Sequence, residues 1–264
     1  MQKKIMLRLI GLIASVVIII GLIIGVKWFT GFEDLSVVED KMGRYELHDE
    51  RKMDYIANGN QTKLDDENIE LINKEVHYDS NPVVLVKNIF DWKNREFNKS
   101  HKKGSFVGER TTKDIINERL ITGCHDDALI VSSILRHFEV PCVVVDTVGI
   151  QWVSDFNDKS TEDFNGHVFV EIYYDDKCFL FDPTLGKVIL GYNPDQQAIP
   201  TTFWLMDKKG FYVLHKGLDP DNYGITSLKD LCISMKMAAL ELKDIIVEIP
   251  SNDVISINQI VFSK

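Results

Sequence analysis

The spacing of apolar residues predicts mainly helices in the first half of the chain and mainly strands in the second half. Pro82 stands where a helix begins, and the apolar residues over 83–92 recur at helical spacing. The same spacing predicts helices over residues 112–120, from 124 to about 138, and over 227–242.

The helix predicted from residue 124 is expected to bury one side. Its apolar positions Ala128, Val131, Leu135 and Phe138 step by three, four and three residues, which is the spacing of a single stripe along a helix. Pro141 ends the pattern, because proline cannot continue a helix.

Strand patterns dominate after that helix. Residues 168–174 alternate between the two sides, an acidic turn follows, and residues 178–181 return, which predicts a hairpin. Further strands are predicted over 142–147, 211–214, 245–249 and 254–262. Helices followed by strands indicate an α+β fold.

An uncharged apolar run occupies residues 9–26. Its length is just enough to span the hydrocarbon core of a bilayer as a helix. Trp28 and Phe29 follow it, as aromatic residues do at a membrane interface, and the cations before it are Lys3, Lys4 and Arg8. The positive-inside rule therefore predicts a cytoplasmic N-terminus. A cleaved signal peptide is the rival interpretation, but the run exceeds a usual signal core and no A-x-A site follows it.

The charge of the chain is distributed unevenly. The formal net charge is -10, yet residues 1–27 contain four basic residues and no acid. The remainder is therefore more acidic than the total, which argues against binding nucleic acid through its phosphates. We predict a cytoplasmic tip and transmembrane anchor over 1–29, a stalk leading into the domain over 30–80, and a globular domain over 81–264. This describes a single-pass protein of the cell membrane whose C-terminal domain is extracytoplasmic.

Three residues of the predicted domain suit nucleophilic catalysis. Cys124 begins a helix, where the helix dipole and free N–H groups stabilise a thiolate. His167 begins the first strand of the hairpin and Asp182 ends the second, so the hairpin brings the two side chains together. Nucleophilic catalysis requires such a set: a nucleophile, a base, and a residue that orients the base.

The residues around these positions resemble the transglutaminase-like superfamily. In that family a G-x-C-x-D-x-A helix start leads to a G-(I/V)-P exit, and then to an H-x-(W/F)-V-E strand and a D-P-T strand end. The matching stretches here are 122–128, 139–141, 166–172 and 182–184, with Glu139 in place of the exit glycine. The resemblance covers roughly residues 81–186. It implies a papain-like core of helices packed on an antiparallel β-sheet, with Cys124 as nucleophile, His167 as base and Asp182 as the orienting residue.

Two positions depart from the family pattern. Asp127 follows Asp126 where many members have an aromatic residue, and we expect both acids to point to solvent and complement the helix N-terminus. Phe97 stands where members often have a Tyr or Trp that supports the oxyanion, and phenylalanine cannot donate a hydrogen bond. The helical spacing of Trp92 favours core packing over a substitute role. The backbone N–H of Cys124 remains a candidate oxyanion donor.

Other uses of these residue types are weaker. His125, Asp126 and Asp127 are adjacent, so on a helix they point in different directions, which argues against a metal site. Cys142 and Cys178 each begin a predicted strand and are expected to be buried. A disulfide between them stays open, because sequence does not determine connectivity.

These inferences predict a membrane-anchored cysteine enzyme that transfers an acyl group from an amide through a thioester on Cys124. Water as acceptor hydrolyses a peptide or protein substrate, an amine cross-links it, and the resemblance does not decide between them. No cofactor or metal is required, because the thiol supplies the nucleophile. The alternative is a catalytically inactive domain of this type that binds cell-surface polymers or proteins, a hypothesis motivated by Phe97 and the adjacent acids.

Overall fold

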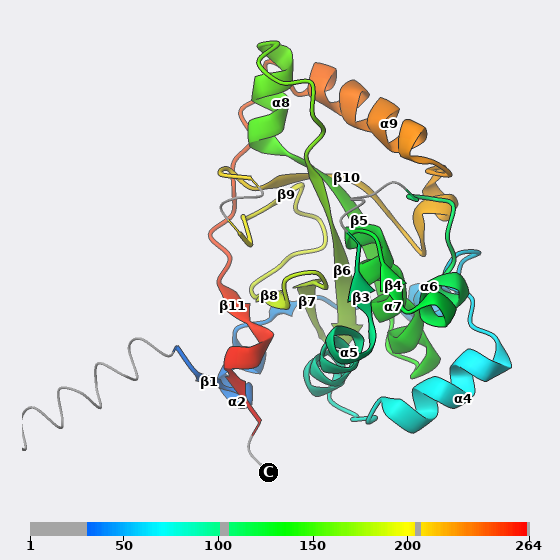
Figure 1. Ribbon diagram of the computed structural model, residues 1–264. Coiled ribbons are helices and arrows are strands. Elements are labelled where there is room, and N and C mark those ends of the chain that lie inside the picture. The colour runs from blue at the N-terminus through cyan, green and yellow to red at the C-terminus, as the bar shows by residue number, and fades with distance from the viewer. Residues whose placement is uncertain (1–30, 101–105, 204–206, 263–264) are drawn as a thin grey trace, which may run out of the picture. The chain divides into compact units, whose positions relative to one another are not determined.

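The computed structural model describes residues 31–100, 106–203 and 207–262 (Figure 1). Contacts divide them into two units, the larger being Asp40–Ile257. The smaller unit is formed by the described parts of Met1–Glu39 and Asn258–Lys264, where β1 (Glu33–Asp34) pairs in parallel with β12 (Ile260–Val261).

The transmembrane run predicted over residues 9–26 lies outside the described residues. Within the described ranges, no helix has both the length and the apolar character needed to cross a membrane. Residues 40–80 contribute α3 (Asp49–Ile56) and α4 (Asp66–Glu75) to the larger unit, and the predicted division at residue 81 stays a prediction.

The larger unit is α+β, as predicted, and its described strands form one antiparallel sheet and a small two-stranded one. The main sheet has the order β11, β8, β7, β6, β5, β10, β9, and β2 also pairs with β7. Its centre is β5 (Cys142–Gly149) and β6 (Gly166–Tyr174), and β6 turns back into β7 (Lys177–Asp182), so the hairpin prediction is confirmed. The remaining strands are β2 (Gly43–Arg44), β3 (Asn98–Lys99), β4 (Leu120–Ile121), β8 (Lys187–Ile189), β9 (Ala198–Ile199), β10 (Phe211–Gly217) and β11 (Val254–Ser256).

Helix α7 (Cys124–His137) packs on β5 and β6, and α5 (Pro82–Glu96) and α6 (Thr112–Glu118) pack on α7 (Figure 1). These three helices are confirmed, as is α9 (Leu228–Glu241). The start of α5 follows from its sequence, because the Asn81 side chain accepts a hydrogen bond from the Val83 N–H and proline occupies the first turn. The other helices of the described residues are α2 (Leu35–Asp40), α8 (Ile150–Asn157), η1 (Pro220–Tyr223) and η2 (Ile257–Gln259).

Helix α7 is buried on all sides rather than along one stripe. Every residue from His125 to Arg136 is buried. The prediction of a single stripe is therefore wrong, because the sheet covers one side of the helix while α5 and α6 cover others. The Arg136 guanidinium donates to the Cys142 carbonyl, which ties the end of α7 to the start of β5. This central, enclosed helix fixes the position of its first residue.

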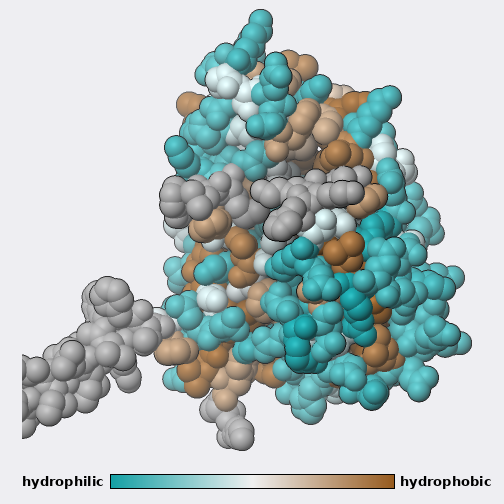
Figure 2. Space-filling model, in the orientation of Figure 1, coloured by the Kyte–Doolittle hydropathy of each residue, from teal (hydrophilic) through white to brown (hydrophobic). Residues whose placement is uncertain are grey.

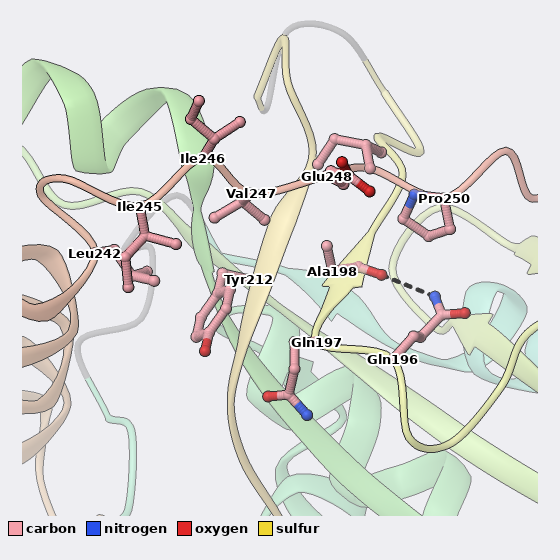
Figure 3. Close-up of a pocket in the computed structure, with 11 residues that line it drawn as sticks. Gln196, Gln197, Ala198, Tyr212, Leu242, Ile245, Ile246, Val247, Glu248 and Pro250 are labelled. Carbon is pink, nitrogen blue, oxygen red and sulfur yellow. Dashed lines mark hydrogen bonds between the residues drawn. The ribbon is translucent and has the colours of Figure 1, made fainter.

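The strand predicted over residues 245–249 does not form. The segment runs as coil past Tyr212 and Ala198 (Figure 3). β9 already occupies the edge of β10, and Ile245 and Ile246 are 58% and 91% exposed, so the alternation of a half-buried strand is missing. The strand predicted over 254–262 is confirmed only as β11 and β12, which η2 separates.

Candidate active site

Cys124 is the first residue of α7, and Gly123 is its N-cap in an extended conformation. Glycine has no side chain to occupy the first N–H groups of the helix, so their partial positive charge is available to a thiolate. Cys124 is a partly exposed residue, whereas Cys142 and Cys178 are fully buried, as predicted. All four cysteines are free, so the disulfide left open by the sequence is not formed.

The register of the β6–β7 hairpin brings His167 and Asp182 together. Val170 faces Phe181, so Asp182 lies opposite Phe169, one pleat from His167 on the same face of the sheet. The Nε2 atom of His167 lies 2.9 Å from Oδ1 of Asp182, and both side chains are fully buried.

Asp182 is held by a full set of donors. Its Oδ1 accepts from the backbone N–H groups of Thr184 and Leu185, each at 3.0 Å, and its Oδ2 accepts from the Thr202 hydroxyl at 2.7 Å. Burial alone would raise the pKa of Asp182, but the charge of His167 and these hydrogen bonds lower it. The carboxylate therefore stays anionic and fixed in orientation beside the imidazole.

The surroundings of Cys124 favour a thiolate paired with an imidazolium. Burial alone would raise the pKa of Cys124, but the neighbouring imidazoles of His125 and His167 lower it to about 7. Burial alone would lower the pKa of His167, but Asp182 and Cys124 raise it to about 10. Because the groups are coupled, these values describe the cluster as a whole. Between about pH 7 and about pH 10, the Cys124 thiolate and the His167 imidazolium coexist.

Asp126 is not at the surface, contrary to the prediction. It is 3% exposed, and its Oδ2 accepts from the Thr122 N–H and hydroxyl, each at 2.8 Å. The Arg110 guanidinium donates to the same oxygen at 2.5 Å. A buried carboxylate requires such a partner, because an unpaired charge is costly to remove from water.

Asp127 is also buried, at 1% exposure, so the prediction for this acid is wrong too. It forms an ion pair with Lys93 of α5, whose side chain is fully buried, and accepts from the Thr184 hydroxyl at 2.9 Å. Lys93 also donates to the Pro183 carbonyl at 2.7 Å. Since Pro183 and Thr184 follow Asp182 directly, this pair fastens the end of β7 to α5 and α7.

One pair at the site was not found from the sequence. The Nε2 atom of His125 lies 2.8 Å from Oδ2 of Asp146 on β5, and the Tyr223 hydroxyl donates to the same oxygen at 3.3 Å. His125 follows Cys124 directly on α7 and, like His167, lowers the pKa of the Cys124 thiol, so two imidazoles act on it. A signal was present, because Asp146 is a lone acid within an apolar strand and therefore needs a buried partner.

The residues suspected of alternative roles have other partners. Trp92 is 1% exposed, and its ring centroid lies 5.1 Å from that of Phe97, so the core packing predicted for Trp92 is confirmed. Asp126, Asp127 and His125 pair with different parts of the chain: Arg110 before α6, Lys93 on α5 and Asp146 on β5. Among the described residues, no group of three or more His, Cys, Asp and Glu side chains is arranged to hold a metal ion.

Two other features of the described surface are an apolar area near α9 and a groove along residues 245–250. Figure 2 shows apolar side chains in the region of α9, where Ile233, Met237 and Leu240 are exposed. A shallow groove lies along the 245–250 segment beside Tyr212 (Figure 3), and its lining has neither thiol nor imidazole.

No protein-family model and no curated protein matches the chain. Two solved chains match its fold. One is from a crystal structure named "a Putative Cysteine Protease from Cytophaga hutchinsonii", with 18% sequence identity and a TM-score of 0.47 over 68% of this chain. This chain covers 51% of that structure, or about half its length.

Proposed function

We propose that the protein is a cysteine enzyme with a papain-like, transglutaminase-like core that transfers an acyl group from a peptide or protein amide. The observation that carries this proposal is one arrangement: a partly accessible Cys124 at a helix start, whose pKa His167 lowers, while His167 Nε2 lies 2.9 Å from the buried carboxylate of Asp182. The motifs that surround these residues support the same assignment.

Acylation starts from the thiolate–imidazolium pair. The sulfur of Cys124 attacks the amide carbon, a C–S bond forms, and the carbonyl oxygen takes up the negative charge. His167 then gives its Nδ1 proton to the leaving nitrogen as the C–N bond breaks, which leaves a thioester and a neutral imidazole. The Asp182 carboxylate stays beside Nε2 of His167 and so fixes the tautomer and the orientation of the ring.

Deacylation reverses these roles. Neutral His167 takes a proton from the attacking water or amine, the new C–O or C–N bond forms, and the C–S bond breaks to restore the thiolate. Water gives hydrolysis and an amine gives cross-linking. The two reactions share every residue named here, so the acceptor is a question for experiment.

The test is a screen of peptide amides with and without an added primary amine. Cys124→Ala should abolish turnover. Cys232→Ala is the matched control, because Cys232 is the other partly exposed cysteine, and it should retain turnover, since burial raises the pKa of the Cys232 thiol. Turnover that survives Cys124→Ala would exclude this mechanism. Specific binding of a cell-surface polymer or protein without any turnover would favour the non-catalytic alternative. The adjacent acids that suggested this alternative, Asp126 and Asp127, are each paired with a cation, which weakens the argument for it.

We also propose that residues 9–26 anchor the protein in the cell membrane, with the catalytic domain extracytoplasmic. The proposal rests on the uncharged apolar run and its basic flank. The full chain should stay in the membrane fraction at alkaline pH, and protease added outside intact cells should digest the domain. Release from membranes at alkaline pH would contradict the anchor.

A further inference from the structure

Two His–Asp pairs rather than one lie near the start of α7, and the histidine of each lowers the pKa of Cys124. His167 and Asp182 lie on the hairpin β6–β7, while His125 on α7 reaches Asp146 on β5. Asp146 pairs with Val168 across the strands, and Thr147 pairs with His167. Because neighbouring strand residues point to opposite faces, Asp146 and His167 project from opposite faces of the sheet. The two pairs are therefore held by opposite faces of the sheet.

We propose that His125 is a second catalytic imidazole, which shares the Cys124 thiolate with His167 and keeps a positive charge beside the reacting carbon throughout acyl transfer. This inference rests on the proposed function. Ordered from one pair to the other, the charges alternate: Asp146 negative, His125 positive, Cys124 negative, His167 positive and Asp182 negative. Each charge thus has opposite charges as its neighbours.

The two imidazoles have different surroundings, and this assigns different tasks to them. Three donors besides His167 share the charge of Asp182, namely two backbone N–H groups and the Thr202 hydroxyl. Only the Tyr223 hydroxyl, at 3.3 Å, is seen to share Asp146 with His125 among the described residues. Asp146 therefore shares its charge with fewer donors besides its histidine than Asp182 does.

His125 accordingly keeps its proton through both half-reactions, and His167 is the residue that gives and regains one. When the sulfur attacks, negative charge moves from sulfur to the carbonyl oxygen, while the His125 charge stays in place. A preorganised positive charge of this kind stabilises the developing oxyanion. It compensates for Phe97, which supplies no donor.

The groups around His125 come from several elements. Cys124 lies next to it on α7, Asp146 faces it from β5, and Tyr223 of η1 reaches the same carboxylate. The ring of His215 stacks on Tyr223 with centroids 5.2 Å apart. His125→Gln removes the charge but retains an N–H that can reach Asp146, so the acid is not left unpaired.

The experiment measures the alkylation rate of Cys124 against pH, by mass spectrometry, in full-length wild type, His125→Gln, His167→Gln and the double variant. The wild-type midpoint should lie near about 7, that of the double variant above the 9.0 of an ordinary thiol because burial then acts alone, and those of the single variants between them. His137→Gln is the matched control, because His137 sits at the exposed end of the same helix and should leave the wild-type profile unchanged.

The same set of variants separates this inference from the proposed function. With peptide substrate, His125→Gln should lower kcat/KM on the order of 10²-fold, and the loss should appear in kcat, as expected for an interaction made in the transition state. A wild-type midpoint and turnover in His125→Gln, with His167→Gln matching the double variant, would overturn the role of His125 alone. An ordinary thiol midpoint in the wild type would overturn the proposed function, and this inference with it. If His125→Gln misfolds by circular dichroism, Asp146→Asn provides the same comparison.

Discussion

Two groups of charged residues meet at the first turn of α7, and they differ in what their charges do. The thiol cluster consists of Cys124, His125, Asp146, His167 and Asp182. The ion-pair cluster consists of Asp126 with Arg110 and Asp127 with Lys93. In the ion-pair cluster each acid has its own cation, so its charge is neutralised at contact distance. In the thiol cluster the charges alternate around a nucleophile that two cations share.

The contrast shows that nearness in sequence is a poor guide to electrostatic influence. Asp126 and Asp127 follow Cys124 almost directly, yet Arg110 and Lys93 compensate them. The acids that act on the sulfur, through their histidines, come from strands far along the chain. The ion-pair cluster is expected to stabilise the fold and hold the end of β7, whereas the thiol cluster is expected to set reactivity.

The largest expected effect comes from removing the base. His167→Ala should lower kcat/KM on the order of 10³-fold, because general acid–base catalysis by a positioned side chain contributes roughly 10²–10⁴-fold. Asp182→Asn should also lower activity by orders of magnitude while the fold is retained, since the imidazole loses the charge that fixes its tautomer. Steady-state kinetics and circular dichroism measure both quantities. Wild-type turnover by Asp182→Asn would remove this carboxylate from the mechanism.

The thiol cluster was predictable from sequence only in part. Cys124 at a helix start, with His167 and Asp182 at the ends of a hairpin, is a local pattern, because the tight turn sets the strand register. The contact of His125 with Asp146 depends on how α7 lies against β5, and no spacing along the chain encodes it.

Burial was harder to predict than secondary structure. α7 shows one apolar stripe in sequence, yet its polar positions are also buried, since Ser132, Asp127 and Arg136 each find partners inside the protein. The acids Asp126 and Asp127 looked like surface residues because their cations lie elsewhere in the chain. The strand predicted over 245–249 is absent because another strand, β9, occupies the edge of β10.

The second largest effect belongs to the ion-pair cluster. Lys93→Met should lower the free energy of unfolding by about 3–5 kcal/mol, because Asp127 is then left charged and unpaired in the interior. Denaturant titration measures it. Lys87→Met on the same helix is the matched control, since the Lys87–Asp91 pair is at the surface and should change stability by less than about 1 kcal/mol. Equal losses in the two variants would contradict the buried role of Lys93.

The pH profile tests the charge state of the thiol cluster. Activity needs the thiolate, whose fraction grows as pH rises through the Cys124 pKa of about 7. It also needs protonated His167, whose fraction falls as pH rises through about 10. We therefore expect kcat/KM to rise around pH 7, stay level and fall near pH 10. The measurement is kcat/KM from pH 5 to pH 11 at constant ionic strength. A single rise near pH 9, as for an ordinary thiol, would contradict the ion pair.

The smallest expected effect concerns one hydroxyl. Thr202 donates to Oδ2 of Asp182 at 2.7 Å, and Thr202→Val removes this bond while nearly preserving the shape of the side chain. Losing one hydrogen bond to a charged group costs roughly 1.5–3 kcal/mol where it is buried, but Asp182 keeps its backbone donors and His167. We therefore expect the lower part of that range, seen as a fall in kcat/KM of about tenfold, with KM little changed.

Thr201→Val is the matched control for that bond. Among the described residues, the buried Thr201 hydroxyl has no hydrogen-bond partner, so the same chemical change at the neighbouring position removes no bond. Its activity should stay within about twofold of wild type, a difference of under about 0.5 kcal/mol. If Thr201→Val and Thr202→Val lose activity equally, the effect comes from disturbing the segment and not from Asp182. If only Thr202→Val loses activity, the orientation of the carboxylate depends on this hydroxyl, and the donors around Asp182 contribute to catalysis through His167.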